Sequence, residues 1–97
     1  MFLLMAIQSF RSKETENLFE TGKSKPFGNI ASVALRKLDM LEAAVTLEDL
    51  RSPPANRLEA LKGGRKGQHS IRINDQFRVC FTWTSAGPAD VEIVDYH

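Results

Sequence analysis

The sequence predicts an α+β domain in which one mostly antiparallel sheet carries two N-terminal helices on one face. Apolar residues recur at helical spacing in the first half of the chain, and they alternate with polar residues at the strand period in the second half. Glycine, proline and asparagine separate the alternating stretches, as turns in an antiparallel sheet require. The 97 residues suffice for one modest core, so we expect a single domain over residues 1–97.

The beginning of the chain predicts a strand and then a helix. Residues 1–7 are apolar but too few to span a bilayer, and they lack the pattern of a secretory signal. We expect their second half to begin a strand, with residues 1–6 as a candidate N-terminal extension. Ser12 suits the N-cap of a helix, Glu14 and Glu16 suit its first turn, and Gly22 suits its end.

A second helix has the clearest pattern in the chain. Its apolar residues recur at spacings of four, four, three and four, and they are Ile30, Ala34, Leu38, Leu41 and Val45. The charged residues Arg36, Lys37, Asp39 and Glu42 are expected mainly on the other side of this helix. Residues 23–26 form the linker before it, and residues 46–56 predict a short helical turn that ends at Pro53 and Pro54.

The rest of the chain predicts the sheet. Strands are expected over residues 57–61, 70–73, 77–83 and 91–94, with a mobile basic turn at residues 63–67 and a tight turn at Asn74 and Asp75. In the third of these strands, alternation places two sets of side chains on opposite faces. Phe77, Val79, Phe81 and Trp83 should pack on the helices, whereas Arg78, Cys80 and Thr82 should point away from them.

Charge is distributed unevenly along the chain. Residues 57–78 contain six basic and two acidic residues, a local balance of +4, whereas the rest of the chain carries −3. A basic zone on an acidic body favours a polyanionic partner, although solvated strand faces would give the same pattern. One cysteine cannot form an internal disulfide, which is typical of a reducing, cytoplasmic setting. Two distant histidines and a single cysteine make a structural zinc site improbable.

The open face of the predicted sheet has side chains that suit RNA backbone cleavage. Arg78 should lie midway along a central strand, with Arg72 and Lys62 nearby and the end Asp95-Tyr96-His97 at the rim. Cleavage needs a deprotonated 2′-hydroxyl, a stabilised pentavalent phosphate and a protonated 5′-oxygen, and no metal or other cofactor is required. The alternative is that Arg78 only solvates the strand, that Tyr96 packs and that His97 is exposed.

Three stretches together resemble the HigB-type killer toxins of the RelE/ParE superfamily of bacterial toxin–antitoxin systems. They are DLRSPPANRLEALKG at residues 49–63, GQHSIRINDQFR at residues 67–78 and VEIVDYH at residues 91–97. The resemblance implies a microbial-RNase-like fold and ribosome-dependent cleavage of messenger RNA by a metal-independent endoribonuclease that inhibits translation. It also implies neutralisation by a helix-turn-helix antitoxin of the HigA type, through which the complex binds operator DNA, and no membrane partner.

The resemblance also implies roles for particular residues. Lys62 and Arg78 match the family's basic positions, and Asp95, Tyr96 and His97 match its carboxyl-terminal positions. In these roles Arg78 stabilises the phosphate, His97 transfers a proton, Tyr96 stacks on a base or donates a hydrogen bond, and Asp95 orients a neighbour. The negative charge of a terminal α-carboxylate would favour the imidazolium form of His97 and the role of general acid.

The sequence allows more than one general base, and it indicates several basic residues for RNA contacts. Some family members have a histidine at the position of Glu59, so either Glu59 is the base or His97 and Tyr96 divide the work. Arg65 and Lys66 match a charged loop that would grip ribosomal RNA. Arg57 and Arg72 belong to the same basic zone and are expected to contact RNA or the ribosome. His69 lies in a strand with no visible partner and is not expected in the site.

Two rival functions keep the same fold. A ParE-like toxin would poison DNA gyrase by protein contact without RNA chemistry, and it would have no need of the Lys62 and Arg78 pair. A catalytically idle module would bind RNA or protein only. For the antitoxin, the exposed sides of the two helices and residues 46–56 are candidate contact surfaces.

Overall fold

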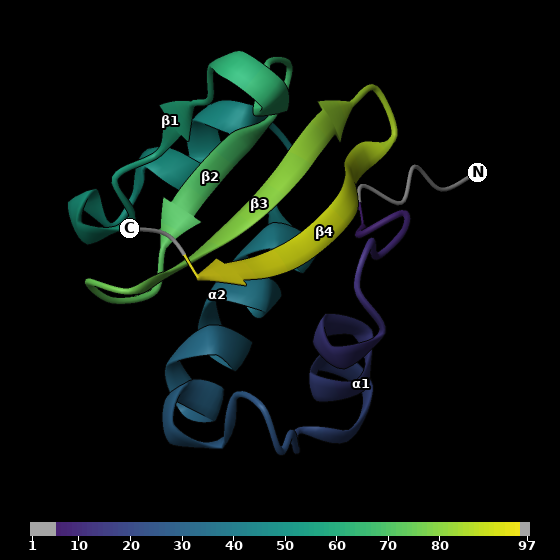
Figure 1. The fold of residues 1–97 in the computed structure, drawn as a ribbon. Coiled ribbons are helices and arrows are strands. Elements are labelled where there is room, and N and C mark those ends of the chain that lie inside the picture. The colour runs from purple at the N-terminus through teal and green to yellow at the C-terminus, as the bar shows by residue number, and fades with distance from the viewer. Residues whose placement is uncertain (1–5, 96–97) are drawn as a thin grey trace.

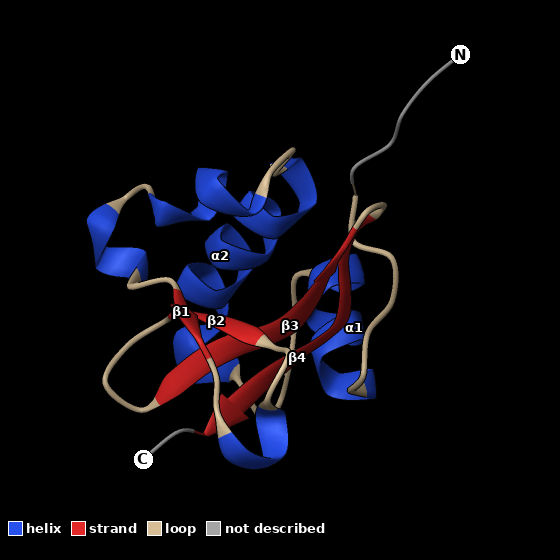
Figure 2. Ribbon diagram, turned by 90° about the horizontal axis from the view of Figure 1, so that it is seen from above, coloured by secondary structure: helices blue, strands red, loops and turns tan. Residues whose placement is uncertain are grey.

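The computed structural model describes residues 6–95, which form an antiparallel sheet with both α-helices on one face. Figures 1 and 2 show α2 along one side of the sheet and α1 beside β4. This arrangement confirms the predicted α+β class. In chain order the elements are α1 (Lys13–Thr21), η1 (Gly28–Ile30), α2 (Ala31–Ala43), η2 (Leu47–Arg51), η3 (Pro54–Asn56), β1 (Glu59–Ala60), η4 (Gly63–Arg65), β2 (His69–Arg72), β3 (Phe77–Thr84) and β4 (Gly87–Asp95), where η marks a 3₁₀ turn.

Helix α1 begins and ends at the predicted residues. The Ser12 hydroxyl accepts a hydrogen bond from the Thr15 N–H, and Gly22 adopts a left-handed conformation with φ 76° at the other end. A residue without a Cβ atom adopts this conformation without strain. The fully buried Leu18 points from α1 into the core.

Helix α2 confirms most of the predicted stripe but differs at two positions. Ala34, Leu38 and Leu41 are buried as expected. The helix ends at Ala43, so Val45 lies beyond it and is 59% exposed. Lys37 belongs to the charged residues expected mainly on the solvent side, yet it is buried, and its ammonium donates to the Asn56 Oδ1 inside the protein. The periodicity alone does not indicate such an acceptor.

The predicted first strand is wrong as an element, although the segment does lie along the sheet. Residues 6–9 are extended without forming a strand, and only Phe10 bridges β4, in parallel with Val91. The Gln8 N–H donates to the Pro88 carbonyl at 2.7 Å, and the Arg11 N–H donates to the Val91 carbonyl at 3.0 Å. These contacts cover the outer edge of β4, which would otherwise expose unpaired backbone groups. Residues 1–5 lie outside the described part of the chain.

Strand β1 is shorter than predicted. Of residues 57–61, only Glu59 and Ala60 form a strand. Arg57 cannot belong to it, because this residue closes η3 in a left-handed conformation with φ 46° and ψ 56°. The chain therefore turns into β1 two residues later than the alternation of side chains suggests.

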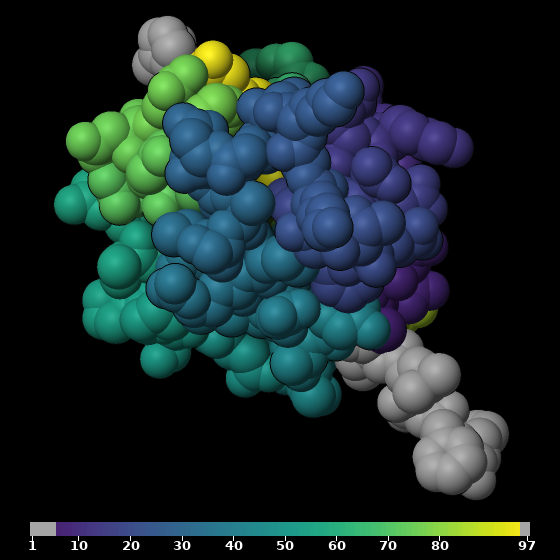
Figure 3. Space-filling model, turned by 90° about the horizontal axis from the view of Figure 1, so that it is seen from below, coloured from purple at the N-terminus to yellow at the C-terminus, as the bar shows by residue number. Residues whose placement is uncertain are grey.

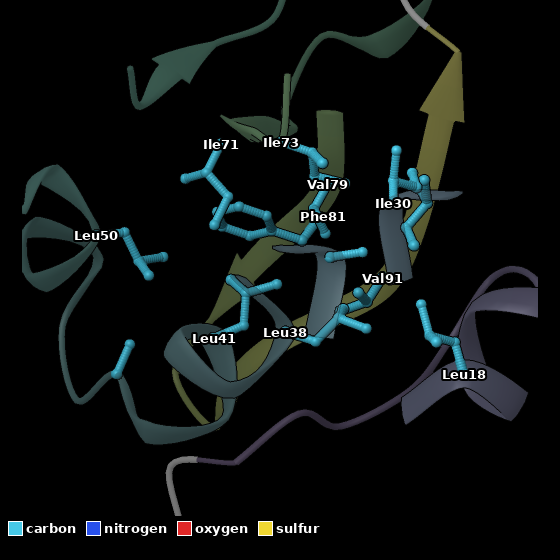
Figure 4. Packing of buried hydrophobic residues seen from close by; sticks show 13 residues of the cluster. Leu18, Ile30, Leu38, Leu41, Leu50, Ile71, Ile73, Val79, Phe81 and Val91 are labelled. Atoms are coloured by element: carbon cyan, nitrogen blue, oxygen red, sulfur yellow. The ribbon is translucent and has the colours of Figure 1, made fainter. Parts of the chain in front are cut away.

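The sheet has the strand order β1-β2-β3-β4, with β3 between two neighbours as expected. The core lies between β3 and α2, where Val79, Phe81, Leu38 and Leu41 are fully buried (Figure 4). Phe77 and Trp83 are partly buried against this cluster, so the predicted core face of β3 is confirmed. Viewed from below, the helical layer covers most of the molecule (Figure 3). None of the helices between residues 6 and 95 has the length and apolar character needed to cross a bilayer.

Candidate active site on the open face of the sheet

The open face of the sheet, opposite the helices, contains two rows of neighbouring side chains. One row follows the strand register through Glu59, Ser70, Cys80 and Glu92, which lie on β1, β2, β3 and β4. The second row consists of Arg72, Arg78 and Val94. In Figure 1 this face lies in front of α2. The rows bring residues that are far apart in sequence onto one surface, as strand alternation requires.

Arg78 is a buried charged side chain on this face with several contacts. It is only 9% exposed, and its Nε donates to the Ser70 Oγ at 2.7 Å. Its Nη2 donates to the Arg57 carbonyl oxygen at 2.6 Å and lies 3.7 Å from the Glu59 Oε1. A guanidinium stays charged at any physiological pH, and contacts from several directions fix its orientation. The structure therefore presents a permanent cation with a defined position.

Two more predicted site residues, Glu59 and Lys62, come from the segment around β1. The Glu59 side chain is half exposed and forms the ion pair with Arg78. Lys62 is exposed at the beginning of η4, two residues after β1 ends. Within residues 6–95 its ammonium has no hydrogen-bond or ion-pair partner, so the charge is available to a ligand. The open face thus combines a fixed cation with a carboxylate, and an exposed cation lies between β1 and η4.

The basic turn at residues 63–67 is attached to the sheet instead of extending freely from it. The Arg65 Nη1 donates to the Gln68 Oε1 at 3.0 Å and to the Glu92 Oε1 at 3.3 Å, which links η4 to β4. Glu92 also lies 4.0 Å from the Arg11 Nε. The Arg65 charge is therefore partly neutralised within the protein, whereas Lys66 is exposed. The turn was predicted to be mobile, and the structure instead attaches it to β4 through Arg65 and Glu92. The local sequence does not indicate Glu92 as the partner of Arg65.

The remaining basic residues differ in their surroundings. Arg72 forms a short ion pair with the fully exposed Asp75 three residues later. Arg57 has an exposed side chain, although its backbone carbonyl belongs to the support of Arg78. His69 lies on the other face, where its ring stacks on Phe81 at a centroid distance of 6.2 Å. This position places its ring on the side of the sheet opposite Arg78.

The carboxyl-terminal residues are only partly described. Asp95 pairs with Phe77 in the register, so alternation directs its side chain to the face opposite Arg78. Its Oδ2 accepts a hydrogen bond from the Gln76 Nε2 at 3.0 Å. Tyr96 and His97 lie outside the described residues. The convergence of these three residues on Arg78 therefore stays a prediction, and the direction of Asp95 does not bring it onto the same face.

Several supporting residues were not identified from the sequence. Ser70 is fully buried and accepts from Arg78, while Asn56 of η3 and Lys37 of α2 form a buried polar pair. Serine and asparagine are common at the ends of strands and in turns. The spacing of Ser70 and Asn56 in the sequence therefore did not indicate their supporting roles. Cys80 is also buried on this face, and burial raises the pKa of its thiol above the usual value.

Comparisons with known proteins agree with this architecture. Residues 8–97 match the family model described as HigB-like toxin, a RelE-like toxin of type II toxin–antitoxin systems. Toxin HigB-1 of Vibrio cholerae is 42% identical over 81 residues, which cover 81% of this chain and 84% of that protein. An uncharacterised protein of Haemophilus influenzae is 38% identical over 78 residues, which cover 78% of this chain and 77% of that protein.

Two solved structures from Staphylococcus aureus share the fold. The YoeB–YefM complex aligns with a TM-score of 0.55 at 19% identity, covering 94% of this chain and 97% of the other. The YoeB dimer aligns with a TM-score of 0.57 at 19% identity, covering 97% of this chain and 98% of the other. The family match over nearly the whole chain and the identity to HigB-1 lead to one conclusion: this chain belongs to the HigB-like toxins, the RelE-like toxins of type II toxin–antitoxin systems.

Proposed function

We propose that this toxin is a metal-independent endoribonuclease that cleaves messenger RNA on the ribosome and thereby inhibits translation. The observation that supports it best is the Arg78 guanidinium, held by Ser70, Arg57 and Glu59 on the open face of the sheet. A cation fixed before the reaction stabilises charge that develops in the transition state without a cost of reorganisation. The family and the basic zone around residues 57–78 support RNA as the substrate.

The proposed chemistry is attack of the 2′-oxygen on the adjacent phosphorus. A base removes the 2′-hydroxyl proton, the new P–O bond forms, and the bond to the 5′-oxygen breaks as an acid protonates that oxygen. The products are a 2′,3′-cyclic phosphate and a 5′-hydroxyl. Arg78 stabilises the charge of the pentavalent phosphate, and Lys62 adds a second cation from η4. Each positioned acid or base contributes roughly 10²–10⁴-fold.

For proton transfer we propose two groups. Glu59 is a candidate base because its half-exposed carboxylate lies 3.7 Å from the guanidinium that would hold the phosphate. His97 is the candidate acid, with Tyr96 as its alternative or as a base-stacking residue. Asp95 would orient a neighbour from the rim of the sheet. Arg57, Arg65, Lys66 and Arg72 would hold RNA or the ribosome, with Arg65 least available because of Glu92.

We propose that an antitoxin neutralises the protein and that the partner is a helix-turn-helix protein of the HigA type, whose complex binds operator DNA. The chain's membership in a toxin–antitoxin family supports an antitoxin, and one solved structure with this fold is a complex of YoeB with YefM. Co-expression with a neighbouring helix-turn-helix protein tests this directly. Rescue of growth together with co-purification is expected, whereas toxicity that persists beside a soluble, unbound partner would contradict it.

The enzymatic proposal is tested by mapping messenger RNA 5′ ends in cells that express the toxin. Wild type is expected to produce new 5′ ends within translated codons, and Arg78→Ala and deletion of His97 are expected to remove them. Arg36→Ala is the matched control, because Arg36 is an exposed arginine on α2, on the helical side of the sheet. Double-strand DNA breaks without RNA cuts would instead support gyrase poisoning. Equal growth arrest by Arg78→Ala and wild type would overturn the enzymatic role.

A further inference from the structure

We propose that the buried pair Lys37 and Asn56 positions Arg78 by fixing the backbone carbonyl on which its guanidinium rests. The inference deepens the function proposed above and rests on it for its catalytic consequence. Lys37 lies on α2 and Asn56 in η3, and neither belongs to the open face of the sheet, so both are positioning residues and not catalytic ones. The connection runs from Lys37 to Asn56, from Asn56 to the left-handed Arg57, and from the Arg57 carbonyl to Arg78.

Asn56 makes the buried hydrogen bonds on which this connection depends. It is fully buried, and its Oδ1 accepts from the Lys37 Nζ at 2.6 Å. Its Nδ2 donates to the Leu50 carbonyl at 3.1 Å and is 3.4 Å from the Ser52 carbonyl. The side chain therefore attaches η3 to α2 and to η2 at the same time. A buried amide with every group satisfied allows one orientation only.

Lys37 is unusual for a lysine because it is only 7% exposed. Burial lowers its pKa from the usual value, and the nearby positive charges of Arg36 and Arg72 lower it further. Each of these effects opposes placing an ammonium here. A lysine is rarely buried without a partner, and the short bond to Asn56 is the contact that compensates it. The short hydrogen bond between Lys37 and Asn56 therefore joins α2 to η3 inside the protein.

Arg57 is the residue that this interaction constrains. Its φ of 46° and ψ of 56° are left-handed, a conformation that is strained for a residue with a Cβ atom. Such a conformation persists only where the surrounding structure fixes it. The neighbouring Asn56 supplies that constraint through its buried contacts. As a result the Arg57 carbonyl points at the Arg78 Nη2, 2.6 Å away.

The inference predicts that loosening the pair displaces the guanidinium while the sheet stays intact. The test uses the full chain with Lys37→Met and Asn56→Ala, and Lys13→Met is the matched control because Lys13 is an exposed lysine on α1. The first readout is solvent exchange of the Arg78 Nη protons by NMR in the free protein, because the Nη2 donates to the Arg57 carbonyl. The β3 backbone amides of Val79 and Phe81 serve as internal reference, because they report global opening.

We expect the Arg78 Nη protons to exchange faster in Lys37→Met and Asn56→Ala than in wild type. The β3 amides and the Lys13→Met control should be unchanged. Exchange equal to wild type in both variants would overturn the inference. If Asn56→Ala does not fold, the exchange rate in Lys37→Met tests the inference by itself. This substitution removes one hydrogen bond and keeps a side chain of similar length. This readout does not depend on RNA cleavage.

The second readout is cleavage on programmed ribosomes. A misplacement of about 1 Å can reduce a rate by about 100-fold, so we expect a loss of that order at saturating ribosomes with an unchanged half-saturating ribosome concentration. A loss only in ribosome affinity would overturn the positioning role. If wild type does not cleave at all, the proposed function fails, while the exchange measurement still decides whether the pair positions Arg78.

Discussion

At the scale of single residues, the sequence indicated which charged side chain would face away from the core but not what would hold it. Alternation along residues 77–83 placed Arg78 on the open face, and the structure confirms that placement. Its hydrogen-bond partners include a serine hydroxyl from β2 and the carbonyl of the left-handed Arg57. Both depend on how the chain folds in three dimensions, and no local pattern encodes them.

Ser70→Ala should destabilise the protein, because it leaves the buried Nε–H of Arg78 without its acceptor. Removing one partner of a buried hydrogen bond costs about 1–3 kcal/mol. The free energy of unfolding from urea titration measures this loss. Ser85→Ala is the control, since Ser85 is exposed in the turn after β3. Equal stability of Ser70→Ala and Ser85→Ala would show that the Ser70 hydroxyl contributes little.

The Cys80 thiol should react slowly in the folded protein. Burial raises its pKa, so little thiolate forms near neutral pH, and the buried sulfur is hard to reach. We expect reaction with a disulfide reagent at pH 7.5 to be far slower in native protein than in urea. Glu92→Gln removes an ion pair that ties η4 to β4 and should accelerate the native reaction. A fast native reaction in wild type would contradict the burial of Cys80.

At the scale of elements, helices with a clear beginning and end were predicted well, and short elements were not. The Ser12 cap and the Gly22 end are local signals, so α1 begins and ends as expected. Strand β1 and the first extended segment depend on long-range contacts, because Arg57 closes η3 and Phe10 makes only one bridge with β4. Elements of two or three residues carry too few side chains for a period to be recognised.

Thr15 joins the helical layer to the sheet, and Thr15→Val should therefore destabilise the protein. The buried Thr15 Oγ1 accepts a hydrogen bond from the backbone N–H of Ile93 on β4 at 3.0 Å. Valine keeps the shape but leaves this N–H unsatisfied, at a cost of about 1–3 kcal/mol. Thermal and urea unfolding measure the effect. Thr15→Ser keeps the hydroxyl and should lose less; the reverse order would rule out the hydrogen bond as the cause.

Asp49 should make the stability of η2 depend on acid pH. Hydrogen bonds from the backbone N–H groups of Thr46 and Val45 lower the pKa of its carboxyl below the usual 3.8. A lowered pKa in the folded state stabilises the protein above the unfolded value, and the contribution is lost as pH falls through the folded value.

The measurement that checks this prediction is urea unfolding of wild type and Asp49→Asn across acid pH. Wild type should be more stable than the variant at pH 6, and the difference should shrink as pH falls below 3.8. Asparagine keeps an oxygen acceptor at this position, so the comparison isolates the charge. A difference that stays constant between pH 6 and pH 2.5 would show that the carboxylate charge is not involved.

At the scale of the whole molecule, the fold brings basic residues from several separate segments to one side of the sheet and the helices to the other. The sequence predicted this division, because strand and helix periods occupy different halves of the chain. It did not predict the links across the molecule, such as Lys37 with Asn56 or Arg65 with Glu92. Such pairs join residues 19 and 27 positions apart, and many other pairings would be equally compatible with the composition.

In the proposed mechanism, the fixed guanidinium of Arg78 stabilises the phosphate during cleavage. The most direct measurement is the single-turnover rate of messenger RNA cleavage by purified toxin on programmed ribosomes, comparing wild type, Arg78→Lys and Arg36→Ala. Lysine keeps the charge but not the planar fork that Ser70 and the Arg57 carbonyl hold. We predict a loss of about 100-fold or more for folded Arg78→Lys and wild-type rates for Arg36→Ala. Cleavage by folded Arg78→Lys at the wild-type rate would contradict the claim.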